Sequence, residues 1–157
     1  MALRPFLIVV VLAGLVLPAR ARLGESEEQC VLRYGPVVER TTSADPGLNL
    51  PVLLFNKNGY AFTATLFHGR VGALLIQRGD SAELSPEEIQ LFLDANRAGE
   101  KWERQPGVMP RTVWLRDDGT QAAYDELHHR LLLSTKVYLQ AQADAVQAEE
   151  VRKTQGF

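Results

Sequence analysis

The sequence has a single cysteine and three histidines, and it lacks a long apolar run outside its N-terminal segment. One thiol cannot pair within its own chain, which excludes a disulfide-stapled miniprotein. A Gly-x-Ser-x-Gly nucleophile motif, a phosphate-binding loop and a dinucleotide-binding fingerprint are all missing, so no catalytic signature supports an enzyme. What remains is ordinary globular composition, with 46% hydrophobic and 23% charged residues in a chain of 157.

Clustered positive charge is missing as well. The arginines are scattered among acidic residues, whereas binding of a nucleic acid needs a basic stripe that displaces counterions from the phosphates. We therefore expect no nucleic-acid partner. Removing residues 1–21 takes Arg4 and Arg20 from the 17 basic residues and leaves 15 against 19 acidic ones, a net charge of −4.

An apolar run of 12 residues, Phe6–Leu17, lies close to the start of the chain. As a helix it would be about 18 Å long, which is too short for the roughly 30 Å of bilayer hydrocarbon. Pro18 ends the run, and Ala19-Arg20-Ala21 supplies the small residues of a cleavage site. We therefore predict a signal peptide over residues 1–21, a periplasmic or secreted protein, and no integral membrane segment after cleavage. An uncleaved anchor is the alternative.

Residues 25–76 predict a helix followed by three strands. Ser26 opens a capping box, and Gly35-Pro36 is typical of a helix end. Three apolar or β-branched runs follow, separated by Asn58-Gly59 and His68-Gly69, which favour hairpin turns. The predicted segments are a loop at Thr41–Asn49 and strands at Val52–Asn56, Tyr60–Phe67 and Arg70–Gln77.

The second half of the chain predicts the same order. Ser85-Pro86-Glu87-Glu88 combines an N-cap, a first-turn proline and an acidic third residue, which predicts a helix that ends near Gly99. Residues 127–133 are ambiguous, because they show no clear alternation and could instead begin the last helix. The predicted segments are strands at Arg111–Arg116, Thr120–Asp125 and His129–Ser134 and a C-terminal helix at Thr135–Lys153.

The two halves show seven identities at an offset of 60 residues. Several of them fall on turns and on a helix start, such as Gly59 with Gly119, where the backbone favours the residue type. We therefore predict an α+β domain over residues 22–134, with a possible tandem repeat of residues 25–76 and 85–136. Its two helix-plus-three-strand units would form one antiparallel sheet with the helices on one face, and residues 135–157 would add a helix and a tail.

An antiparallel sheet that helices cover on one side leaves its other face available for binding. In Tyr60–Phe67 the even positions are the more apolar, so Thr63 and Thr65 are predicted to lie on the open face. Trp114 and Trp102 are further binding candidates, because a tryptophan on an exposed sheet face is a common anchor. The alternative for Trp114 is a place in the core beneath a helix.

Cys30 lies on the apolar side of the first predicted helix, where a free thiol usually behaves as a small buried hydrophobe. A small hydrolase or thiol-dependent enzyme would instead pair Cys30 with His68 or His128. A disulfide between two chains is a third possibility. His128 and His129 are adjacent, so on a strand they would point to opposite faces, and we predict neither a metal site nor a cofactor.

The stretch Arg33-Tyr34-Gly35-Pro36 ahead of a short-turned meander, within paired helix-and-three-strand units, carries a resemblance. The chain resembles uncharacterised small exported bacterial proteins with such a stretch. Its fold resembles the β-lactamase inhibitor protein and the small lipoprotein of the outer-membrane assembly machine. Those units usually have two helices, and the acylated cysteine of the lipoprotein is absent here. The resemblance implies a binding role and names no target, so we expect a non-catalytic protein-interaction module of the cell envelope, whose partner is another envelope or secreted protein.

Overall fold

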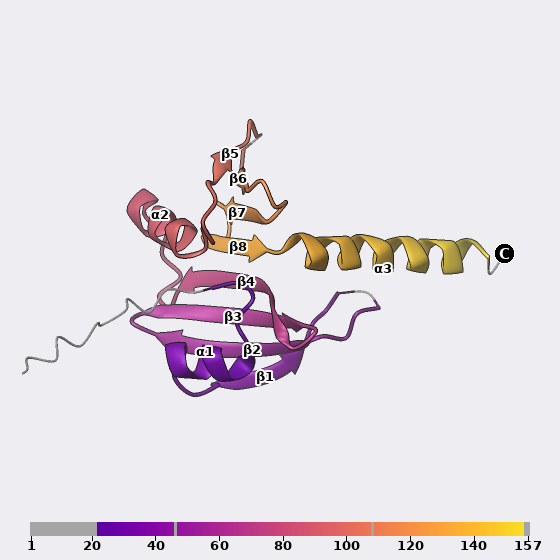
Figure 1. Ribbon diagram of the computed structural model, residues 1–157, viewed down its shortest axis with the longest axis horizontal. Helices are drawn as coiled ribbons and strands as arrows, with labels where there is room; N and C mark the ends of the chain where they lie inside the picture. The colour runs from indigo at the N-terminus through magenta and orange to yellow at the C-terminus, as the bar shows by residue number, and fades with distance from the viewer. Residues whose placement is uncertain (1–21, 46, 108, 156–157) are drawn as a thin grey trace, which may run out of the picture.

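The computed structural model describes residues 22–155 apart from Pro46 and Val108. The signal peptide predicted for residues 1–21 lies outside these described residues. Within them there are three helices and eight strands, with four strands after each of the first two helices and the third helix last (Figure 1). The elements are α1 (Glu27–Tyr34), β1 (Glu39–Thr42), β2 (Pro51–Lys57), β3 (Tyr60–Phe67), β4 (Arg70–Arg78), α2 (Pro86–Ala95), β5 (Glu103–Arg104), β6 (Arg111–Leu115), β7 (Gln121–Asp125), β8 (Arg130–Ser134) and α3 (Lys136–Thr154).

The strands form one antiparallel sheet in the order β1-β2-β3-β4-β8-β7-β6-β5. The two halves therefore meet at a β4–β8 seam, where Leu74 is opposite Leu133 and Ile76 is opposite Leu131. Each half runs from its helix through an edge strand to the seam. The α+β class with an antiparallel sheet is confirmed, and the ambiguous segment before α3 is the strand β8.

The sheet has two more strands than the sequence predicts, β1 and β5. Both are short and polar, and every residue in them is exposed, so neither shows the alternation that indicates a strand. They form because their backbones pair with the inner strands, as Arg40 does opposite Leu53 and Arg104 opposite Trp114. The predicted loop at Thr41–Asn49 therefore begins inside β1.

The local signals of helix starts and turns are confirmed. Ser26 and Ser85 each form a complete capping box, which satisfies backbone N–H groups at the start of α1 and α2. The β2–β3 turn has φ 52° at Asn58 and 82° at Gly59, the left-handed backbone that the Asn-Gly pair predicts. The Gly119 turn in the second half has φ 81°.

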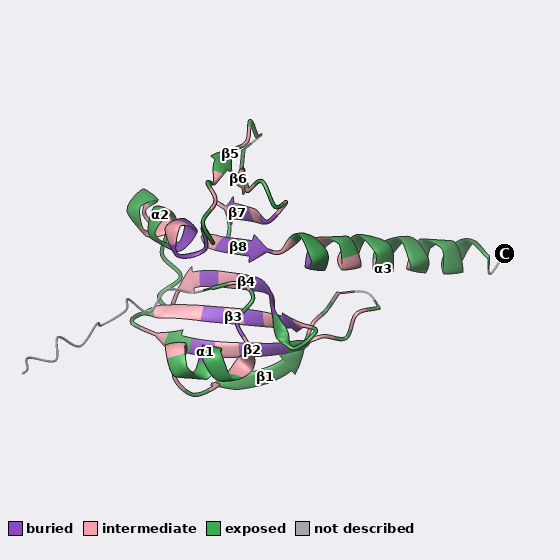
Figure 2. Ribbon diagram, in the orientation of Figure 1, coloured by how far each residue is buried: buried purple, intermediate pink, exposed green. Residues whose placement is uncertain are grey.

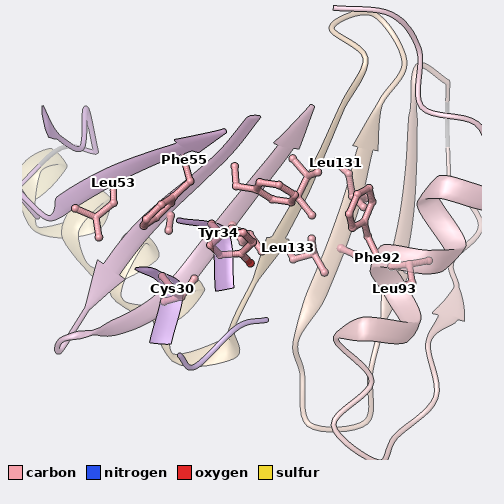
Figure 3. Packing of buried hydrophobic residues seen from close by; sticks show 14 of the residues in the cluster. Cys30, Tyr34, Leu53, Phe55, Phe92, Leu93, Leu131 and Leu133 are labelled. Atoms are coloured by element: carbon pink, nitrogen blue, oxygen red, sulfur yellow. The ribbon is translucent and has the colours of Figure 1, made fainter. Parts of the chain in front are cut away.

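The hydrophobic core lies between the sheet and the helices α1 and α2. Figure 3 shows side chains of both helices, such as Tyr34 and Phe92, directed toward strand residues of both halves. In β3 the alternate residues Phe62 and Ala64 are buried, as the sequence predicts. Helices thus cover one face of the sheet, and the seam residue Leu131 shares one core with α1 and α2.

The last helix, α3, leaves the sheet immediately after β8 and extends away from it (Figures 1 and 2). Its one buried residue is Tyr138, in the first turn. Tyr138 packs where β4 has Gly72, whose Cβ, if it had one, would lie 2.8 Å from Cβ of Phe67 and 3.2 Å from Cβ of Tyr138. Glycine is needed at this close approach, and beyond Tyr138 the helix is largely exposed.

Candidate functional site: the open sheet face

The face of the sheet opposite α1 and α2 carries the strand residues that alternate with the core. Its central row contains mainly apolar side chains, and the next row adds hydroxyl groups. In register across the sheet, the central row is Leu54, Thr63, Leu75, Leu132, Ala123 and Val113, and the next row is Val52, Thr65, Ala73, Ser134 and Gln121. We call this surface the open face.

A hollow of about 720 Å³ lies on the open face. Its floor comes from β2, β3 and β4 of the first half and from β7 and β8 of the second. Residues 41–45 and the start of α3 form a wall at one end, and Arg111, Asp125 and Arg130 border the hollow as well. Because the floor joins strands from both halves, neither half alone would form this hollow.

The wall is held together by side chains from segments that are far apart in the sequence. The Tyr138 hydroxyl donates to Oδ2 of Asp45 over 2.6 Å, and Nε2 of Gln142 donates to Oδ1 of Asp45 over 2.8 Å. Burial, followed by the Asp45 carboxylate, raises the pKa of Tyr138. The phenol therefore stays protonated at neutral pH and keeps donating, which fixes α3 against the loop between β1 and β2.

A row of charged side chains borders the hollow. Arg130 is opposite Asp125 in the β7–β8 register, and Asp125 is opposite Arg111 in the β6–β7 register. The Asp125 carboxylate is used locally, because it contacts Nδ1 of His128 at 2.8 Å and accepts from the backbone N–H groups of Leu127 and His128 at 3.1 Å. These bonds, above all that with the His128 side chain, lower the pKa of Asp125. Within the described part of the chain, neither Arg111 nor Arg130 has an ion-pair partner.

Thr63 and Thr65 lie on the open face and line the hollow, where the alternation in β3 predicts them. The two tryptophans lie elsewhere. Trp114 is opposite the fully buried Ala122 and packs against the core, so of its two predicted places the one beneath a helix is correct. Trp102 also packs against the core, and its Nε1 donates to the carbonyl of Leu93 over 2.7 Å. Neither tryptophan is an anchor on the open face.

Sequence reasoning missed the rest of the lining, which includes Leu132, Arg130, Arg111 and Tyr138. The run Leu131-Leu132-Leu133 shows no polar alternation, so the sequence does not reveal which leucine faces outward. Once β8 is in register with β4, Leu132 is the exposed member, at 41%. Tyr138 belongs to a helix, and its position depends on the turn that α3 makes after β8.

A second cleft, of about 820 Å³, lies beside the end of α2 and the start of α3. Its central cation, Arg116, donates to the carbonyl of Asn96, to Oγ1 of Thr120 and to the carboxylate of Asp118. The hydrogen bond from Arg116 lowers the pKa of Asp118 to about 2. Because these polar groups satisfy one another, they hold this part of the chain in place.

Cys30 is fully buried, as the sequence predicts. Burial raises the pKa of its thiol to about 11, which disfavours the thiolate that a nucleophile needs. His128 is bound to Asp125, and Nδ1 of His129 contacts the carbonyl of Ser81 at 3.1 Å. Among the described residues, no group of three or more His, Cys, Asp or Glu side chains is placed to hold a metal ion.

No family model, curated protein or solved structure matches the chain. The resemblance to the β-lactamase inhibitor protein and to the small assembly lipoprotein therefore stays a prediction. Among the residues that the structure describes, no helix has both the length and the apolar character needed to cross a membrane.

Proposed function

We propose that the chain is an exported protein-interaction module of the cell envelope, which binds another envelope or secreted protein on its open face. The apolar run Phe6–Leu17 and the cleavage pattern that follows it support export. The hollow on the open face supports binding, and it is the observation on which the proposal rests.

The backbone of the hollow's floor is not available to a partner. β3, β4, β8 and β7 each pair with a strand on both sides, so their N–H and C=O groups are used within the sheet. A partner on this face meets side chains only. The apolar row around Leu75 and Leu132 offers surface to bury, and the Thr63 hydroxyl offers a hydrogen bond, whereas the Thr65 hydroxyl is already bonded to Tyr138. This mixture is typical of protein interfaces that form and dissociate.

The alternative, a thiol-dependent enzyme that uses Cys30, has less support. The thiol is fully buried and its pKa is raised, whereas a catalytic cysteine needs an accessible thiolate. An interchain disulfide through Cys30 requires the same exposure and has the same weakness.

The experiment is affinity capture of partners from an envelope extract of the source organism. The bait is the exported protein, as wild type and with Leu132→Asp, which places a charge on the apolar row. The matched control is Leu91→Asp on the outer side of α2, because Leu91 is exposed to a similar extent, 48% against 41% for Leu132. Thermal unfolding of all three proteins checks that the substitutions leave the fold intact.

We expect the Leu132→Asp bait to lose a partner that wild type and Leu91→Asp both retain. Capture of the same partner by all three proteins would show that the open face is not the contact surface. Loss from Leu91→Asp alone would place the contact on the helix-covered side of the molecule. Capture of no partner by wild type would contradict the interaction module itself.

A further inference from the structure

The two arginines beside the hollow form no ion pair with any residue that the structure describes. Arg111 and Arg130 lie on either side of Asp125 in the sheet register, but Asp125 directs its carboxylate to the backbone and side chain of its own turn. Across two strand spacings, the Cβ atoms of the two arginines are about 10 Å apart. Their long side chains can therefore bind carboxylates of one ligand, or of two neighbouring residues of a ligand.

The carboxylates that line the hollow are already used within the protein, because Asp45 accepts from Tyr138 and Gln142 and Asp125 accepts within its own turn. The two arginines of the same lining have no ion-pair partner among the described residues. Carboxylates of a partner can therefore pair with these arginines, and such pairs fix the orientation of the partner on the surface.

The floor next to the arginines indicates the chemistry of the rest of the ligand. Along β8, Leu132 lies two residues from Arg130 on the same face, and Leu75 is its neighbour across the seam. The hydroxyl of Thr63 interrupts this apolar surface, whereas Thr65 is already bonded to Tyr138 and Ser134 is buried. An acyl chain cannot bond to the Thr63 hydroxyl, whereas a polypeptide has backbone amides and polar side chains that can.

Building on the proposed function, we infer that the segment that binds in the hollow is an acidic–apolar stretch of a partner protein. Its aliphatic side chains cover the row around Leu75 and Leu132, and its Asp or Glu carboxylates pair with Arg111 and Arg130.

The test uses a phage-displayed library of random dodecapeptides, selected on the immobilised exported protein. Parallel selections use the double variant Arg111→Gln/Arg130→Gln and the control Arg104→Gln. Arg104 lies on β5 opposite Trp114 and is exposed on the helix-covered side, so its change removes charge away from the hollow. Enriched peptides are then synthesised, and their dissociation constants are measured by fluorescence anisotropy at two salt concentrations. Each peptide is also made with Asn and Gln in place of Asp and Glu.

We expect wild type and Arg104→Gln to enrich peptides with two or more acidic residues beside Leu, Ile or Val. The double variant should bind these peptides at least about tenfold more weakly than wild type does. Wild type should bind the amide versions more weakly by a similar factor, because both changes remove charge-assisted hydrogen bonds. The amide peptides test the inference on the unaltered protein if the double variant is unstable. Enrichment of peptides without acidic residues, or no enrichment over the double variant, would overturn the inference.

Two further measurements separate this inference from the function on which it rests. Peptides that lose affinity for Leu132→Gln but keep it for the double variant bind the open face without the arginines, so only the inference fails. Peptides that bind wild type and Leu132→Gln equally do not use the open face, so the proposed function fails too. Sodium dodecanoate is titrated in parallel. If it binds at the arginines and acidic peptides are not enriched, the ligand of the hollow is a carboxylate amphiphile and the inference of a polypeptide is wrong.

Discussion

Cys30 belongs to α1, and its thiol is fully buried among aliphatic and aromatic side chains of the core. Replacing it with serine places a hydroxyl in the same apolar surroundings without a hydrogen-bond partner. We expect Cys30→Ser to lower the free energy of unfolding by about 1–3 kcal/mol, measured by urea denaturation. An unchanged free energy of unfolding would contradict the burial of this residue.

The same burial makes a prediction about pH. Burial raises the pKa of Cys30 from its ordinary value of 9.0 to about 11 in the folded protein. The folded state therefore favours the protonated thiol, and this contribution to stability is present below about pH 9 and is lost as the pH rises toward 11. We expect the free energy of unfolding to fall over that window in wild type, and less in Cys30→Ala.

Ellman's reagent tests the thiol itself. At pH 8 the native protein should react slowly, and it should react completely in denaturant. Rapid labelling of the native protein would contradict the account of Cys30.

Gly59 tests the turn between β2 and β3. Its φ of 82° lies in the left-handed region, and its carbonyl accepts from the N–H of Gly79 over 2.7 Å. A β-branched residue is strained at this backbone angle, so Gly59→Val should lower the free energy of unfolding by about 1–3 kcal/mol. Asn56→Val is the matched control, because Asn56 is an exposed strand residue where valine fits. Equal melting temperatures of the two variants would refute the turn.

At the scale of elements, the sequence predicts those helices, turns and strands whose formation depends on residues that are close together in the chain. Capping boxes at Ser26 and Ser85, the Asn58-Gly59 turn and the alternation in β3 locate two helices and several strands. The sequence does not predict β1 and β5, whose polar residues become strands only because an inner strand pairs with them. It places Thr63 and Thr65 in the site but misses Arg130 and Tyr138, which join the hollow through long-range register and through the direction of α3.

The helix α3 divides into an anchored first part and an exposed second part. Tyr138 is 4% exposed and is bonded to Asp45, whereas Val146 and Val151 are about half exposed, at 45% and 46%. Ending the chain after Ala145 should therefore leave the melting temperature nearly unchanged. Ending it before Thr135 removes Tyr138 from its site and should cost about 3 kcal/mol or more of unfolding free energy.

Affinity capture with the protein that ends after Ala145 also decides between two contact surfaces. The open face predicts that the protein ending after Ala145 still captures the partner. Loss of the partner with stability retained would make the exposed part of α3 the contact instead. Equal destabilisation by both truncations would contradict the division of α3.

At the scale of the whole molecule, the two halves become one site only through the β4–β8 seam. Thr63 and Thr65 come from the first half, and Leu132, Arg130 and Arg111 come from the second. The pairing of Leu75 with Leu132 across the seam makes the apolar row continuous. The core formed with α1 and α2 on the other face holds this surface in one shape.

The most direct test of the open face as the binding surface is site-specific photo-crosslinking in living cells. A benzoylphenylalanine is placed at position 63, on the open face, and in a matched strain at position 91, on the outer side of α2. The account predicts that irradiation produces a discrete adduct with another protein from position 63 and none from position 91. Adducts from position 91 alone, equal adducts from both positions, or none from position 63 would contradict it.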